Sequence, residues 1–266
     1  MELEGKSAIV SGGAGGLGGA TARRLTELGM KVVIFEPEFA KASEFASTLG
    51  DNAIPLAGDH NNDGDVGAAI DCARSAGTLF INVNSAGVAI PTPATADEKG
   101  VPHDRDIFQQ MIELHLLGPF NMSRLCAAAF AGNEPDEHGQ RGVIVNTSST
   151  AAWDGQARQV AYAAAKSAIA GMTLAMARDL AEIGVRACAI APGPMWTPRL
   201  AGASEDLKAE LLKNVAFPKR FGQAAEFASL VEAIVNTPFL NGQTIRLDGA
   251  LSTPLTPMTP PDEGKP

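Results

Sequence analysis

The chain has 266 residues, 45% of them hydrophobic, and a formal net charge of −9. This length fits one large α/β domain or two small ones, and the hydrophobic fraction suffices for a sizeable core. The negative charge excludes the basic footprint of a nucleic-acid-binding protein, and it argues against binding to an anionic membrane surface.

Short apolar segments alternate along the chain with segments in which small and apolar residues recur at helical spacing. The first strand covers residues 7–11, and the helix after it covers 17–28, with Gly29 at the position of a helix C-cap. Further strands are predicted at 31–35, 53–56, 78–83, 142–146, 185–190 and 243–247, and further helices at 40–49, 65–76, 107–130 and 159–183. This order predicts the α/β class: a doubly wound Rossmann fold, with about seven parallel strands and helices on both faces.

No change in composition marks a domain boundary, so we expect a single dinucleotide-binding and catalytic domain over residues 1–266. From about residue 250 to residue 266 the chain is rich in Pro and Thr, which predicts an irregular tail. Two loops, at 88–106 and 131–141, are longer than the usual ~4–6 residues.

A glycine-rich loop joins the first strand to the first helix. Glycines let the backbone turn tightly and approach a pyrophosphate, and the helix N-terminus offers free N–H groups and a positive dipole end. The string alone is weak evidence, but its place between a strand and a helix is the context that dinucleotide binding requires. The predicted cofactor-binding residues of this loop are Ser11, Gly12, Gly15, Gly16, Leu17 and Gly18.

Glu36 stands at the end of the second strand, where a carboxylate accepts hydrogen bonds from the adenosine ribose hydroxyls. The same carboxylate repels the 2′-phosphate of NADP. No Arg or Lys lies in the glycine loop or directly after Glu36 to neutralise that phosphate. We therefore predict NAD as the cofactor; the alternative is that Glu36 is a solvated loop acid.

Polar and small residues also follow the third and fourth strands, at the strand ends where open α/β sheets bind ligands. Asp59 and His60 follow the third strand and are predicted to lie beside the adenine. Ser85, Ala86 and Gly87 follow the fourth strand and are predicted to contact the cofactor, although such a string alone is more often an ordinary turn.

Tyr162 is the single tyrosine of the chain, and Lys166 lies four residues later on the same face of a predicted helix. A free phenol has a pKa of ~10 and is a poor base at neutral pH, whereas a nearby ammonium lowers that pKa. The pair is thus a candidate acid/base unit for a carbinol proton, with the Ser149 hydroxyl placed to hold the substrate oxygen. Taken singly, a buried tyrosine and a surface lysine remain the alternatives.

The whole set of motifs resembles the short-chain dehydrogenase/reductase family. The matching elements are SGGAGGLG, NSAG, Ser149, YAAAK and Pro192-Gly193. The resemblance implies that Tyr162 is the acid/base, that Lys166 lowers its pKa and holds the nicotinamide ribose, and that Ser149 orients the substrate. It further implies that Pro192, Met195 and Thr197 lie near the nicotinamide and that Gln156 lies beside the substrate.

Several longer stretches look like the type II 3-hydroxyacyl-CoA dehydrogenases of this family, also known as type 10 17β-hydroxysteroid dehydrogenases. Examples are GMTLAMARDLAEIGVR and PFLNGQTIRLDGA. This likeness implies a homotetramer that oxidises a (S)-3-hydroxyacyl-CoA to the 3-oxoacyl-CoA. A hydroxysteroid or other apolar alcohol is the alternative substrate, and a nucleotide-binding scaffold with little turnover is the alternative function.

Three residues depart from the family pattern. His115 stands where the family usually has an Asn that holds a water for proton transfer, and we include it among the catalytic residues because imidazole also donates and accepts hydrogen bonds. Ser11 replaces the usual Thr, and Ser85 replaces the commoner Asn.

The remaining signals concern metals, partners and compartment. The four histidines show no metal-ligand spacing, so no metal is predicted. A cluster of Lys213, Lys219 and Arg220 is a candidate for binding CoA phosphates.

We expect a cytoplasmic protein without a membrane span. The three cysteines are widely spaced, the start does not resemble a signal peptide, and there is no run of ~18 apolar residues.

Overall fold

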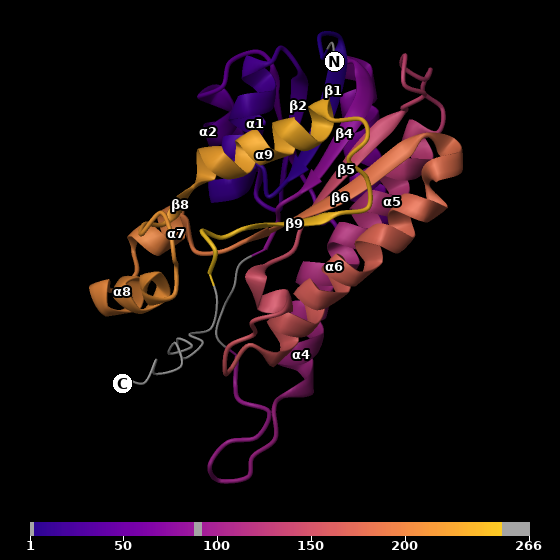
Figure 1. Ribbon diagram of the computed structural model, residues 1–266. Helices are drawn as coiled ribbons and strands as arrows, with labels where there is room; N and C mark the ends of the chain where they lie inside the picture. The colour runs from indigo at the N-terminus through magenta and orange to yellow at the C-terminus, as the bar shows by residue number, and fades with distance from the viewer. Residues whose placement is uncertain (1–2, 88–91, 252–266) are drawn as a thin grey trace, which may run out of the picture.

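Parallel strands build the centre of the computed structural model, which describes residues 3–87 and 92–251 (Figure 1). Within these residues the main sheet has seven strands in the order β3-β2-β1-β4-β5-β6-β9, all parallel. They are β1 (Lys6–Ser11), β2 (Lys31–Glu36), β3 (Ala53–Ala57), β4 (Thr78–Asn84), β5 (Gly142–Thr147), β6 (Val185–Pro192) and β9 (Thr244–Leu247). The predicted doubly wound Rossmann fold is therefore confirmed. The part of the predicted tail beyond residue 251 lies outside the described residues.

Helices cover both faces of the sheet. The α-helices of the described residues are α1 (Gly16–Glu27), α2 (Phe39–Ser47), α3 (Asp63–Ala76), α4 (Arg105–Ile112), α5 (Gly118–Phe130), α6 (Val160–Asp179), α7 (Pro198–Ala201), α8 (Glu205–Lys213) and α9 (Ala224–Asn236). Of these, α4, α7 and α8 add no residue to the two core layers of the sheet. Local caps fix several of their starts: the Asn62 side chain accepts the Asp65 N–H at α3, and Gln223 and Glu226 form a capping box at α9. The short strands β7 (Met195–Trp196) and β8 (Gly222–Gln223) pair beside the sheet.

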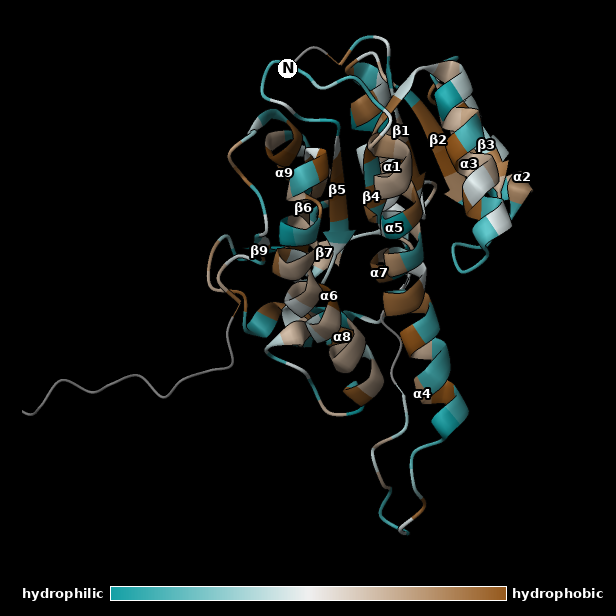
Figure 2. Ribbon diagram, turned by 90° about the vertical axis from the view of Figure 1, so that its right-hand side faces the viewer, coloured by the Kyte–Doolittle hydropathy of each residue, from teal (hydrophilic) through white to brown (hydrophobic). Residues whose placement is uncertain are grey.

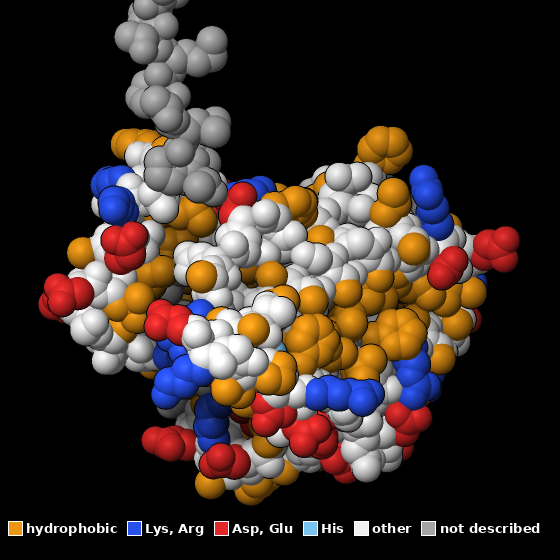
Figure 3. Space-filling model, turned by 90° about the horizontal axis from the view of Figure 1, so that it is seen from below, with side chains coloured by type: hydrophobic (Ala, Val, Ile, Leu, Met, Phe, Trp, Pro, Cys, Tyr) orange, Lys and Arg blue, Asp and Glu red, His pale blue; other side chains and the backbone are white. Residues whose placement is uncertain are grey.

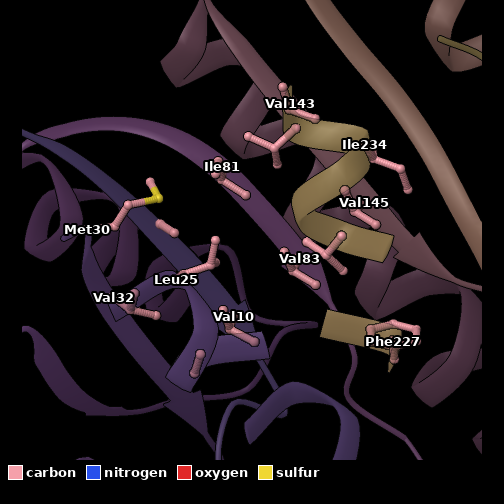
Figure 4. Close-up of a cluster of buried hydrophobic side chains, with 14 of the residues drawn as sticks. Val10, Leu25, Met30, Val32, Ile81, Val83, Val143, Val145, Phe227 and Ile234 are labelled. Atoms are coloured by element: carbon pink, nitrogen blue, oxygen red, sulfur yellow. The ribbon is translucent and has the colours of Figure 1, made fainter. Parts of the chain in front are cut away.

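The core divides into two layers because successive side chains of a strand point to opposite faces. On one face, Val10, Val32 and Val83 pack with α1, α2 and α9 (Figure 4). On the other face, Ile9 and Val33 pack with α3, α5 and the end of α6. The strands are accordingly hydrophobic along most of their length, as Figure 2 shows. Such fully covered strands hold the sheet, and hence the loops at its carboxyl edge, in fixed positions.

The predicted helix at 107–130 contains a π-helical turn, Glu113–Leu117, between α4 and α5. Pro119 in the first turn of α5 has no N–H to donate to the carbonyl four residues earlier, and its ring crowds that carbonyl. The wider turn relieves this conflict and turns His115 into the interior, where it is 1% exposed.

Among the described residues, α6 is the one helix whose length and composition would allow it to cross a membrane. It packs against β5, β6 and α4 and carries the buried Lys166. It is therefore a helix of the folded domain.

Candidate active site

The order of the strands reverses between β1 and β4, and a cleft of about 1550 Å³ opens at the carboxyl ends of the strands there. Every residue that the sequence predicted for catalysis or cofactor binding lines this cleft, as does Gln156, predicted for the substrate. The sequence thus placed the residues together correctly; their chemical roles stay predictions.

The backbone around Gly12 and Gly18 is packed so closely that neither position can carry a side chain. Gly12 has a φ of +68°, its N–H donates to Phe35 O at 2.9 Å, and a Cβ added to it would lie 2.7 Å from the Ala86 backbone. A Cβ on Gly18 would likewise overlap the Gly12 carbonyl. Gly15 caps α1 without a side-chain hydrogen bond, so the N–H groups of the first helical turn remain available to an anion.

Two buried hydroxyls facing the cleft fit a polar ligand. The Oγ of Ser85 and the Oγ1 of Thr147 are buried and have no hydrogen-bond partner among the described residues, although both residues line the cleft. Buried hydroxyls without partners are costly. A bound dinucleotide that lies along the glycine loop would supply the missing hydrogen-bond partners of these two hydroxyls.

Glu36 closes the end of the cleft beside β2, and its side chain is almost fully buried. One carboxylate oxygen accepts the Ala14 N–H at 2.9 Å, and the other accepts from the Lys41 ammonium at 2.8 Å. Glu36 is therefore not a solvated loop acid. Lys41, on the first turn of α2, was missed from sequence because it lies five residues beyond Glu36.

At the other end of the cleft, α6 brings Tyr162 and Lys166 together, and the Tyr162 hydroxyl is hydrogen-bonded to Ser149. The Lys166 ammonium lies 5.7 Å from the centre of the Tyr162 ring and donates to Thr147 O at 2.7 Å. Burial lowers the pKa of Lys166 to about 7. Burial also raises the pKa of the Tyr162 phenol, with its hydrogen bond to Ser149 acting in the opposite direction. The net effect on Tyr162 is opposite to the lowering expected from the nearby lysine.

His115 completes this end of the cleft. Its ring meets the Tyr162 ring edge-on, and it occupies the space beside Gly87, where an added Cβ would lie 2.5 Å from the imidazole. Gly87 has a φ of +123°, so both its backbone and its lack of a side chain suit this contact. The structure therefore makes His115 a direct neighbour of the candidate base.

His60 lies deeper than expected of an adenine contact. It is 7% exposed, its ring fills the space above Gly118, and Asn121 donates to its carbonyl at 2.9 Å. Burial lowers the pKa of His60; Asp59 raises it and the charge on Lys166 lowers it further. His60 is thus within electrostatic reach of Lys166, which its position in the sequence did not suggest.

The basic residues proposed for CoA phosphates do not converge on the cleft. Arg220 forms two hydrogen bonds with Glu226, and the Lys219 ammonium donates to two carbonyls at the end of α8. Lys213 pairs with Glu210 at 3.8 Å, and none of the three lines the main cleft. Arg199, on α7, lines it instead.

A loop beside the substrate end is fastened to the sheet by an ion pair that the sequence analysis missed. Arg246 on β9 contacts Asp154 at 2.8 Å and Asp248 at 2.7 Å, and it stacks on Trp153. These contacts hold the segment that leads to Gln156. Among the described residues, no group of three His, Cys, Asp or Glu side chains is arranged to hold a metal ion.

Comparisons with known proteins agree with this geometry. The family model described as short chain dehydrogenase matches residues 6–208. The 3-hydroxyacyl-CoA dehydrogenase type-2 of Drosophila melanogaster is 46% identical over 91% of this chain and 96% of its own length. The crystal structure of the Mycobacterium avium protein of that name is 41% identical, covers 95% of this chain and 98% of its own, and superposes with a TM-score of 0.92. A 3-oxoacyl-[acyl-carrier protein] reductase from Brucella melitensis, solved with bound NAD, is 29% identical over 94% of this chain and 92% of its own, with a TM-score of 0.78.

Proposed function

This chain is an oxidoreductase that belongs to the short-chain dehydrogenase family, and from that membership we propose that it oxidises a 3-hydroxyacyl-CoA to the 3-oxoacyl-CoA with NAD. The observation that carries the proposal is the meeting of Ser149, Tyr162 and Lys166 in one cleft with the glycine loop. The names of the relatives that align over nearly their full length support the acyl-CoA substrate.

The chemistry of the chain's own residues follows from their positions. Bound NAD supplies the nicotinamide ring that accepts a hydride from the carbinol carbon. Ser149 donates a hydrogen bond to the substrate oxygen, and Tyr162, as the phenolate, takes the hydroxyl proton as the C–O bond becomes a carbonyl. Since burial raises the pKa of Tyr162, the phenolate depends on the nearby positive charge of Lys166.

The preference for NAD over NADP rests on Glu36. Its buried carboxylate is fixed by the Ala14 N–H and stands at the end of β2, the position from which open α/β sheets contact the adenosine ribose. A fixed negative charge favours ribose hydroxyls over a phosphate. The glycine loop and the two buried hydroxyls described above support the fit of a dinucleotide.

We also propose assembly into a homotetramer through the outer faces of α5 and α6. Large hydrophobic side chains are exposed there although charged residues would be expected on a solvated helix: Phe120, Val160 and Leu174, with Leu117 just before α5. Figure 3 shows the molecule from below, where hydrophobic side chains gather in the middle and on the right of the face and charged ones lie mainly on the left and along its lower part. Sedimentation analysis of the purified protein tests the proposed state.

The test of the function is NADH formation from a panel of substrates. We expect turnover of a short 3-hydroxyacyl-CoA, followed by the absorbance of NADH, at higher kcat/KM than any 3-hydroxysteroid or 17-hydroxysteroid. The cleft also has an apolar wall that suits a steroid, formed by Leu200, Leu207 and Leu211. A higher kcat/KM for a steroid than for every acyl-CoA would therefore replace the proposed substrate. NADH binding without turnover of either class would favour the scaffold function.

A further inference from the structure

The partner of Glu36 bears on which dinucleotide the cleft accepts. Lys41 lies on α2, two residues after the helix begins, and its ammonium is 2.8 Å from the outer oxygen of the Glu36 carboxylate. Both residues line the cleft. The cations that line it among the described residues are Lys41, Lys166 and Arg199, and of these Lys41 alone contacts the carboxylate at the ribose end.

The two partners of this ion pair differ in freedom. The Glu36 side chain is 4% exposed and is also fixed by the Ala14 N–H, whereas the Lys41 side chain is 50% exposed on a flexible stem. Because the Lys41 end of the ion pair is half-exposed, water can take the place of the ammonium when it moves. When the ammonium moves, Glu36 keeps its backbone hydrogen bond. Lys41 is therefore the partner that can turn toward a ligand.

The charge of the pair decides how strongly a phosphate is repelled. Glu36 alone places one negative charge at this end, and a phosphate monoester carries ≈ −1.5 to −2 charges at neutral pH. With Lys41 beside it, the local charge sums to about zero, and the ammonium adds a donor for phosphate oxygens. The pair therefore repels a 2′-phosphate less strongly than Glu36 alone would.

We propose that Lys41 is a cofactor-specificity residue that admits the 2′-phosphate of NADP(H), so that the protein binds NADP(H) as a second, weaker cofactor. This inference rests on the proposed function, since it concerns the same dinucleotide cleft. Lys41 contacts the phosphate directly, and Glu36 retains the preference for the unphosphorylated ribose. The sequence suggested NAD alone because it showed no cation directly after Glu36.

Calorimetric titration of the protein with NADH and with NADPH tests the proposal without relying on turnover. We expect the wild type to bind both, with NADH tighter. Lys41→Met should raise the Kd for NADPH about tenfold, as expected for the loss of one charge beside a doubly charged group in water, and should change the Kd for NADH less than about twofold. Lys41→Arg should keep NADPH binding, and Glu36→Gln should tighten it.

Lys31→Met is the matched control because it removes the same charge from the other end of β2, where Lys31 donates to Asp51 O. It should leave both dissociation constants unchanged. An equal change of both constants in Lys41→Met, or no change in either, would overturn the role of Lys41 while NADH binding still supported the proposed function. A wild type that binds NADH but shows no NADPH binding overturns the inference alone. Failure to bind either dinucleotide overturns both.

Discussion

The ring of His115 lies edge-on to the ring of Tyr162, with 5.0 Å between their centroids and 89° between their planes. The π-helical turn before Pro119 brings the imidazole to this place, and Gly87 leaves room for it. One of the three residues that depart from the family pattern, His115, therefore packs directly against the candidate base, and its effect on turnover can be measured.

Replacing His115 separates hydrogen bonding from packing. Because both imidazole and amide donate and accept hydrogen bonds, we expect His115→Asn to keep kcat within roughly threefold. His115→Leu removes that capacity and should lower kcat by about tenfold or more, as the loss of a group that supports proton transfer does. Steady-state kinetics of both variants, with NADH affinity as the control for folding, gives the answer. Equal activity of the two would exclude a hydrogen-bonding role.

Lys166 is predicted to reduce the stability of the fold in a pH-dependent manner. Its pKa is about 7 in the folded protein and ~10.4 in an unfolded chain, so the unfolded state binds more protons between these values. Above the unfolded pKa, the lysine is neutral in both states and does not lower the stability of the fold. As pH falls from there to about 7, the stability decreases, because only the unfolded state takes up the proton. Lys166→Met should raise Tm by several degrees at pH 6, and the gain should shrink as pH rises toward 10.

Lys31→Met controls the Lys166 experiment, because Lys31 lies on the surface away from the cleft. Thermal unfolding of the control should show no comparable dependence of the difference on pH. The measured quantity is the difference in stability between Lys166→Met and the wild type at each pH. A smaller gain at pH 6 than at pH 9 would contradict the burial of a charged lysine.

The glycine loop allows backbone conformation and close approach to be tested separately. Gly12 and Gly29 both have positive φ, +68° and +86°, but only a Cβ on Gly12 would meet neighbouring backbone. Gly29→Ala should cost about 1 kcal/mol of unfolding free energy from the backbone alone. Gly12→Ala should cost more and should also weaken NADH binding by at least about tenfold. Urea unfolding and NADH titration of both variants check this; equal costs and unchanged binding would argue against the tight loop.

Ser149 is predicted to act on the substrate through its hydroxyl. Ser149→Ala removes the hydrogen bond to Tyr162 and the donor to the substrate oxygen, so kcat should fall by about 10² while NADH affinity is kept. Ser149→Thr retains the hydroxyl and should recover part of the loss. Kinetics that show a rise in KM alone would assign Ser149 to binding only.

The fold and the residues of the cleft followed from local patterns. Alternation of strands and helices predicts parallel βαβ units, and parallel strands bring loops such as Ser11–Gly18 and the segment after Asn84 to one edge of the sheet. The four-residue spacing of Tyr162 and Lys166 likewise fixes a shared helix face. These features depend on spacing along the chain and on the regular geometry of helices and strands, so the sequence alone predicts them.

What could not be predicted depends on contacts between distant side chains. The π-helical turn reflects a conflict at Pro119, and the helices α7, α8 and α9 were not among the helices predicted from the sequence. The pair of Lys41 and Glu36 requires the position of α2, and the raised pKa of Tyr162 requires the degree of burial. Each is set by tertiary packing, on which spacing along the chain carries little information.

The most direct test of the central claim compares wild type with Tyr162→Phe in a single turnover of a short 3-hydroxyacyl-CoA with NAD. The variant lacks only the phenolic oxygen, so we predict that NADH affinity stays within about twofold while the rate of NADH formation falls by 10²–10⁴-fold, the usual contribution of an acid/base group. A rate close to that of the wild type would contradict the claim that Tyr162 takes the carbinol proton.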